Sequence, residues 1–118
     1  MNGKTFGITY VATTESEWTA GLNDKKVTDT TTMLFIFPDS GIQTFWMDRV
    51  NTSLDMIWIN VTGSVGRVVY LVNAAPACPP MGLCPDYVPS SPANYVLEAR
   101  GGFSIANGIS LGTTIQFG

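Results

Sequence analysis

The chain has 118 residues and a net charge of −3, contains no histidine, and only 13% of its residues are charged. This length predicts a single domain, residues 1–118, large enough to bury a hydrophobic core. Six Lys and Arg residues, scattered along the chain, exclude the clustered positive charge that nucleic-acid binding requires. No apolar run approaches the ~20 residues of a transmembrane helix, and the absence of histidine excludes Ser-His and Cys-His nucleophile pairs.

The first part of the chain predicts one strand and one short helix. Apolar residues alternate with polar or small ones from residue 6 to residue 12, which indicates a half-buried strand. Thr14 and Glu17 have the spacing of a capping box, in which each side chain accepts a hydrogen bond from the backbone N–H of the other residue. A helix of about two turns is expected to follow and to end at Gly21.

The middle of the chain predicts two hairpins. Residues 30–37 form an apolar strand, which a Pro-Asp-Ser-Gly turn closes at residues 38–41. Residues 43–47 are expected to pair back on that strand. A second hairpin joins residues 54–61 to residues 65–72 through a Thr-Gly-Ser turn.

The last part of the chain begins with a segment that lacks periodicity. Residues 73–92 hold both cysteines and six of the seven prolines, which cannot donate to a strand ladder. Strands are expected again at residues 94–99 and 113–117, with a turn or a single helical turn at residues 101–108. The pattern predicts a mainly β fold, a compact antiparallel sandwich or partly open barrel with one or two short helices. The predicted core includes Phe45, Leu54, Ile57, Val69, Leu71 and Leu97.

Two segments near the middle of the chain carry a family signature. Residues 43–47 read Gln-Thr-Phe-Trp-Met, and residues 54–59 read Leu-Asp-Met-Ile-Trp-Ile. An aromatic-Met pair followed by Leu-Asp and an apolar run resembles the core of a prokaryotic family known as domain of unknown function 192. Further segments resemble that family in the same order: Gly21-Leu22, residues 33–38, Cys78, Cys84-Pro85, residues 92–98 and Gly108-Ile109. The resemblance implies a fold and no activity.

The chain also departs from the family pattern in the loop between these two segments. It has Asp48-Arg49-Val50 where the family tends to have Lys-Asn-Thr, and Ser53 where the family tends to have proline. Family members often carry a signal or lipid anchor before this domain. The resemblance therefore implies that Met1 begins the mature or trimmed part of a longer precursor.

The two cysteines, Cys78 and Cys84, permit three interpretations. A structural disulfide is favoured over free thiols and over a metal or redox site, because two cysteines without histidine are a poor zinc site. A disulfide and a surface of few charged residues indicate an extracytoplasmic protein that is secreted, periplasmic or anchored through a missing N-terminal segment. The alternative is simply an acidic, Thr-rich protein. Asn51 and Asn60 lie in glycosylation acceptor patterns, which arise often by chance in such sequences.

Two carboxylates occur within predicted apolar strands. Asp55 is expected to be buried and to accept hydrogen bonds from backbone N–H groups of residues 48–53; the alternative is an acid, base or ligand-orienting group. Glu98 is expected to pair with Arg100, which lies two residues away. A pair formed by Asp55 and Glu98 is the alternative, because two such carboxyl groups can hydrolyse glycosides.

The remaining candidate residues suit binding better than catalysis. Trp46, Asp48 and Arg49 form a predicted loop surface, and Tyr87 lies in the Pro-rich segment. With Asp55 and Glu98 they make up the candidate binding residues, with no catalytic residue, metal or cofactor expected. The sequence favours a non-enzymatic module that binds a small ligand, a glycan or a protein. Hydrolase-like or redox activity, through the carboxylates or the cysteines, and a subunit of a surface assembly are the alternatives.

Overall fold

The computed structural model describes residues 5–78 and 83–118, and it is 46% strand and 9% helix. The predicted mainly β class is therefore confirmed. Met1 to Lys4 and residues 79–82 of the Pro-rich segment lie outside the described residues. The elements are β1 Tyr10–Ala12, α1 Glu15–Ala20, β2 Thr32–Gly41, β3 Phe45–Trp46, β4 Leu54–Thr62, β5 Val65–Ala75, β6 Asp86–Tyr87, β7 Ala93–Arg100, α2 Phe103–Ala106 and β8 Thr114–Gln116.

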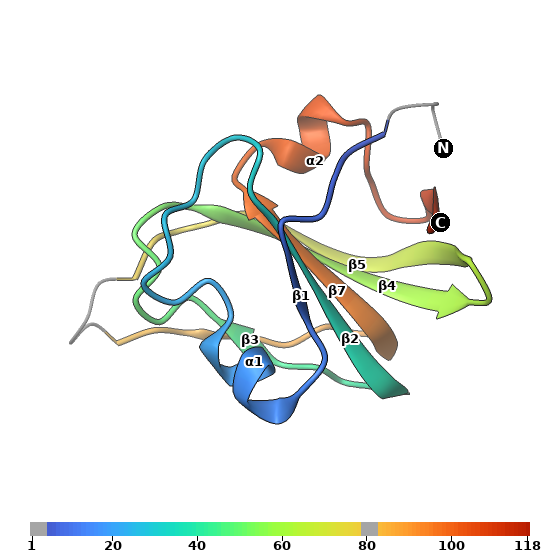
Figure 1. Cartoon of the computed structure of the whole chain (residues 1–118), viewed down its shortest axis with the longest axis horizontal. Helices are drawn as coiled ribbons and strands as arrows, with labels where there is room; N and C mark the ends of the chain where they lie inside the picture. The colour runs from blue at the N-terminus through green and yellow to red at the C-terminus, as the bar shows by residue number, and fades with distance from the viewer. Residues whose placement is uncertain (1–4, 79–82) are drawn as a thin grey trace.

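Six of these strands form one curled sheet in the order β1-β2-β7-β4-β5-β8. Strand β1 runs parallel to β2, and every other pairing in the sheet is antiparallel. Strand β7 comes late in the chain but lies between β2 and β4 at the centre of the sheet (Figure 1). Helix α2 lies on one side of the sheet, whereas α1 and β3 lie on the other.

Alternation along β4 divides the core into two clusters, one on each face of the sheet. Leu54, Met56 and Trp58 pack in the cluster that α1 and β3 cover, and Ile57 and Ile59 pack in the cluster on the side of α2. This is the division that a period of two predicts. The predicted core residues Phe45, Leu54, Ile57 and Leu97 are buried, but Val69 and Leu71 are only partly buried.

The partial burial of Val69 and Leu71 follows from the position of β5 near the border of the sheet. Its outer neighbour, β8, pairs only with residues 65–67 of β5. Beyond that point β5 has a strand neighbour on one side only, so its side chains are covered less completely.

The predicted helix start is confirmed. The Thr14 hydroxyl accepts a hydrogen bond from the Glu17 N–H at 3.3 Å, and a Glu17 carboxylate oxygen accepts from the Thr14 N–H at 3.1 Å. Gly21 ends the helix with φ of 51°, a left-handed value that glycine adopts without strain. The strand predicted before this helix is shorter than expected and spans Tyr10–Ala12 only.

The predicted hairpin between residues 30–37 and 43–47 is wrong. Strand β2 continues through Pro38 to Gly41 and already has β1 and β7 on its two sides. Strand β3 pairs instead with β6, which lies in the Pro-rich segment, with Phe45 opposite Tyr87 and Trp46 opposite Asp86. The predicted turn at residues 38–41 is also wrong, because these residues belong to β2, whose pairing with β7 shifts register between Ile36 and Gly41. The pairing partner of β3 is 40 residues further along the chain, counting from residue 46 to residue 86.

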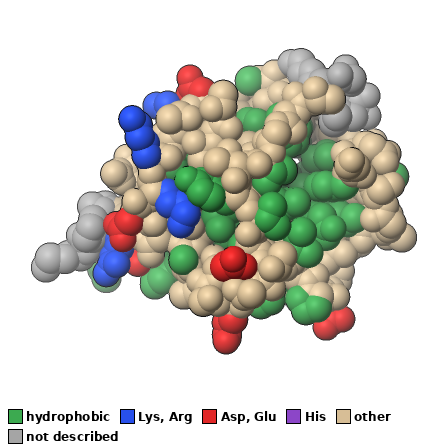
Figure 2. Space-filling model, viewed as in Figure 1, with side chains coloured by type: hydrophobic (Ala, Val, Ile, Leu, Met, Phe, Trp, Pro, Cys, Tyr) green, Lys and Arg blue, Asp and Glu red, His purple; other side chains and the backbone are tan. Residues whose placement is uncertain are grey.

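Charged side chains are sparse on the surface of the molecule. In Figure 2 the Lys and Arg side chains lie mainly to the left, while hydrophobic side chains gather on the right with no charged side chain among them. Two ion pairs occur in the described part of the chain, Arg49 with Asp24 at 3.6 Å and Arg100 with Asp29 at 3.0 Å. All four side chains are largely exposed, so these pairs contribute little to stability.

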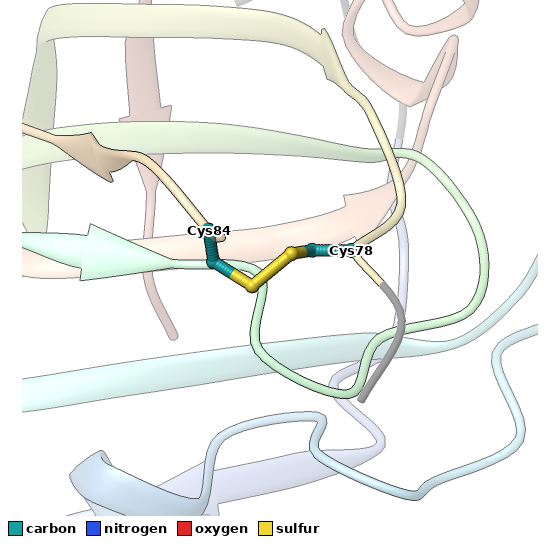
Figure 3. Close-up of a disulfide and its surroundings, with 2 residues drawn as sticks. All are labelled: Cys78 and Cys84. Atoms are coloured by element: carbon teal, nitrogen blue, oxygen red, sulfur yellow. A yellow bond between two sulfur atoms is a disulfide. The ribbon is translucent and has the colours of Figure 1, made fainter. Parts of the chain in front are cut away.

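A disulfide joins Cys78 to Cys84, as predicted (Figure 3). The Cys78 N–H donates to the Val50 carbonyl at 3.1 Å, which attaches this end of the disulfide to the loop before β4. The other end lies two residues before β6, which pairs with β3. The disulfide therefore holds the two-stranded β3-β6 layer close to the loop that connects β3 with β4.

The disulfide prediction can be checked by mass spectrometry and unfolding. Purified oxidised protein should take up no alkylating reagent without reductant and two equivalents after reduction. Because the bond restricts the unfolded chain, the Cys78→Ser, Cys84→Ser double variant should lose about 2–3 kcal/mol of unfolding free energy. Alkylation of both thiols in the unreduced protein would show that the bond is absent.

Candidate functional site

Glu98 occupies an apolar position at the centre of the sheet. Its neighbours across the strands are Met33 of β2 and Met56 of β4, and both are buried. Glu98 itself is only 3% exposed, and burial raises the pKa of its carboxyl from 4.5 to about 8. The group is therefore mostly neutral near pH 7, because a charged carboxylate is poorly solvated there.

The expected partner of Glu98 is not its partner in the structure. Arg100 lies at the end of β7, and its guanidinium reaches outward to Asp29 at the solvated surface. Among the described residues, the Glu98 carboxyl has no hydrogen bond or ion pair, and desolvation is the only cause of its raised pKa. A buried carboxyl without a partner is unusual, since buried polar groups are normally hydrogen-bonded.

Glu98 lines a cavity of about 320 Å³. The cavity lies between α1 with its following turn, the face of β2, and the segment that contains β3 and the loop after it. Its polar lining includes Asn23, whose side-chain oxygen is buried without a hydrogen bond to any described residue, Gln43 and Asp48. Its aromatic lining consists of Trp18, Phe35, Phe37, Phe45 and Trp46.

Four of these aromatic side chains form a connected cluster, in which Phe37 and Phe45, 6.3 Å apart, join the two closer pairs. Trp18 lies 4.7 Å from Phe37, and Phe35 lies 4.7 Å from Phe45, measured between ring centres. The Trp18 indole N–H donates to the carbonyls of Ala12 and Ile36 at 3.1 and 3.2 Å, which fixes α1 against the sheet. These contacts make the apolar wall of the cavity a packed surface in which the rings support one another.

The loop after β3 is held against the turn after α1. The Asp24 N–H donates to the Arg49 carbonyl at 3.2 Å, and their side chains form the exposed ion pair. Arg49 has φ of 57°, a conformation that is uncommon for a residue with a side chain. This connection places Asp48, which lines the cavity, beside the segment that carries Asn23.

Asp55 lies on the opposite face of the sheet and is fully buried. Its Oδ1 accepts from the N–H groups of Ala74 and Gly102 at 2.8 and 3.2 Å, and its Oδ2 accepts from the Ser104 N–H at 2.8 Å. Backbone N–H groups do satisfy this carboxylate, but the predicted donors in residues 48–53 are wrong. The loop instead pairs with the chain beside the donors, because the Ser53 carbonyl accepts from the Gly101 N–H at 2.9 Å.

The proposed hydrolytic pair is not supported by this arrangement. Asp55 stands opposite Ala99, and Glu98 stands opposite Met56, so the two carboxyl groups project from opposite faces of the sheet. Glycoside hydrolysis requires both groups to flank one bond. Asp55 is instead a structural group that joins β4 to β5 and to the start of α2.

Half of the predicted binding residues come together in the structure. Trp46, which is 50% exposed, lines the cavity with Asp48 and Glu98. Arg49 lies in the loop after β3 and Tyr87 lies in β6, but neither residue lines the cavity. Asp55 lies on the opposite face of the sheet. Sequence reasoning missed Trp18, Asn23, Phe35, Phe37 and Gln43. Alternation from Met33 to Phe37 could have placed both phenylalanines on one face, but nothing in the sequence placed α1 over them.

Substitution of Asp55 tests its structural role. Asp55→Asn keeps the shape of the side chain, but its NH₂ group would face a backbone N–H that needs an acceptor. We expect a loss of about 1–3 kcal/mol in unfolding free energy by urea denaturation, and weaker hydrogen-exchange protection at Ser104. Asp39→Asn, at an exposed aspartate, is the matched control and should change little. An unaltered Asp55→Asn protein would show that these hydrogen bonds contribute nothing.

Glu98 should make stability depend on pH. Its pKa is raised in the folded state, so its stabilising contribution is complete below the unfolded value of 4.5 and is lost as pH rises through about 8. Within that window, wild-type protein should lose up to about 1.4 kcal/mol per pH unit relative to Glu98→Gln, which does not titrate. Urea unfolding of both proteins at several pH values measures the difference, with the exposed-site variant Glu15→Gln as control. Parallel pH profiles for wild-type and Glu98→Gln proteins would contradict the raised pKa.

Comparisons with known proteins agree on the fold and the family. A crystal structure of a protein of unknown function from Novosphingobium aromaticivorans is 26% identical, with a TM-score of 0.69 over 89% of this chain and 71% of that one. A protein from Sinorhizobium meliloti, assigned provisionally as a transcription regulator, is also 26% identical, with a TM-score of 0.71 over 90% and 78% of the two chains. The chain matches no curated protein sequence. The DUF192 model, described as Uncharacterized ACR, matches residues 2–117, so the chain belongs to the DUF192 family.

Proposed function

We propose that this protein is a non-enzymatic, extracytoplasmic binding module that holds a small ligand in the cavity lined by Glu98. The observation that carries this proposal is a buried carboxyl that faces a cavity and has no partner among the described residues. Such a group is unfavourable in the empty protein, because it has lost most of its exposure to water without gaining a hydrogen bond to a described residue. A ligand that supplies the missing partner would remove this penalty.

The size and lining of the cavity support a small ligand. A volume of about 320 Å³ is at the lower end of the range for small-molecule sites, which are mostly apolar with a few polar groups. Five aromatic rings and a few polar side chains fit that description. Trp46 is half exposed and lies where it could cover a bound molecule.

The disulfide supports the extracytoplasmic assignment. Disulfides persist in oxidising compartments and are rare in reducing ones. Cys78 is buried and packs beside Val50, which favours a structural role over redox activity. Within the described residues, no helix is long and apolar enough to cross a membrane.

Two other functions have less support. The relative assigned as a transcription regulator suggests DNA, but a net charge of −3 opposes direct contact with phosphates. A surface assembly through strand addition needs an accessible sheet edge. The border strands, β1 and β8, have three residues each and would offer few hydrogen bonds to an added strand.

A fragment screen by protein-observed NMR tests the proposal. Small uncharged and charged fragments should shift amide signals of residues that line the cavity, and Trp46→Ala should weaken that binding at least about tenfold, because one wall is lost. Leu111→Ala is the matched control, since Leu111 is also an exposed apolar side chain but does not line the cavity. Fragments that bind only at other surfaces, or bind both variants equally, would refute a ligand site here.

A further inference from the structure

We infer that the cavity selects a small alkylated ammonium ion, which pairs with the Glu98 carboxylate and packs against the surrounding aromatic rings. This inference rests on the proposed binding function and names its ligand class.

The charges that line the cavity favour a cation. Glu98 and Asp48 are its two ionisable lining residues, and the described lining contains no Lys or Arg. Glu98 is only 3% exposed, and its carboxyl has no partner among the described residues. Asp48, by contrast, is only partly buried. An anion would gain no ion pair in this lining, and a neutral ligand would leave the Glu98 charge uncompensated whenever it forms, whereas a cation pairs with the carboxylate.

The rings decide which kind of cation fits. Trp18, Phe37 and Trp46 line the cavity together with Phe35 and Phe45. Aromatic faces attract cations, and cages of such rings bind quaternary ammonium groups. Ammonium ions that carry alkyl groups also bury apolar surface against the rings. A metal ion lacks this match, because in the described part of the chain no three His, Cys, Asp or Glu side chains come together to hold one.

Binding would release a proton. The Glu98 carboxyl is mostly protonated at neutral pH, because burial raises its pKa to about 8. When the cation enters, the O–H bond breaks, the carboxylate keeps the electron pair and pairs with the ammonium ion, and the proton leaves to solvent. The charge of the site is therefore the same before and after binding, which avoids an isolated buried charge at either stage.

Other titratable groups lie in or near the cavity. Asp48 is the other such group in the lining. The elements packed against this face carry further titratable groups outside the lining: Tyr10, Glu15, Glu17, Asp24, Lys25, Arg49, Tyr70, Asp86 and Tyr87. If Glu98 is the source, the proton released on binding is lost in Glu98→Gln, whereas a proton from any of the other groups is still released by that variant.

Choline and its neutral carbon analogue, 3,3-dimethyl-1-butanol, provide a matched pair of probes. The two molecules have nearly the same shape and differ by the positive charge. Isothermal titration calorimetry of the wild-type protein should give at least about tenfold tighter binding of choline. Choline affinity should rise up to about tenfold from pH 6 to pH 7, because the proton is released more easily. Titrations in buffers of different ionisation enthalpy should report a proton released at pH 7.

Variants identify the groups involved. Glu98→Gln keeps the shape of the neutral acid, so it should fold, lose at least about tenfold in choline affinity and release no proton, while its affinity for the neutral analogue stays the same. Trp46→Ala should weaken the binding of both choline and 3,3-dimethyl-1-butanol. Glu15→Gln, which removes an exposed carboxylate of α1, should bind both as the wild type does.

Three results would overturn the inference. Equal binding of choline and 3,3-dimethyl-1-butanol would leave an apolar binding site and refute selection of a cation. Choline binding that survives Glu98→Gln would show that general negative charge is sufficient. If neither probe binds, the cavity does not accept this ligand class, and the fragment screen still decides separately whether it binds any small molecule.

Discussion

The three hydrogen bonds accepted by Asp55 organise this fold. They connect the start of β4 to Ala74, where β5 departs from regular pairing, and to Gly102 and Ser104, where the chain turns from β7 into α2. Ala74 has φ of 52° and Gly102 has φ of 98°, so both donors occupy left-handed conformations that the carboxylate helps to hold. Gly101 fits tightly beside them, because a side chain there would collide with the Ser53 hydroxyl.

This anchor also fixes the position of the cavity residue on the other face. Once β4 and β7 are aligned with Asp55 opposite Ala99, Glu98 must lie opposite Met56 and point away from Asp55. The two buried carboxyl groups therefore belong to adjacent residue pairs of the β4-β7 ladder and project from opposite faces of the sheet. Backbone amides satisfy one of them, and the other has no partner among the residues that the structure describes. The contrast separates a carboxylate that maintains the fold from a carboxyl that is available for a ligand.

The sequence predicted local features better than distant ones. The capping box at Thr14, the β4-β5 hairpin and the burial of Asp55 all follow from spacing and alternation over a few residues. The donors to Asp55 lie 19, 47 and 49 residues away, and no local pattern encodes such distances. The pairing of β3 with β6 was missed for the same reason, because the turn predicted at residues 38–41 indicated a nearer partner. The cavity depends on α1 packing across β2, so Trp46, Asp48 and Glu98 were found without most of the rings that surround them.

The central position of β7 has a consequence for a chain that emerges N-terminus first. Strands β1 and β2 form one part of the sheet, and β4 and β5 form another, but β7 must enter between them to join the two. Until residues 93–100 are available, the two parts have no shared hydrogen-bonded border. Most of the six-stranded sheet must therefore be synthesised before it can assemble around β7, and the edges of β2 and β4 that β7 covers stay unpaired and open to handling by chaperones until then.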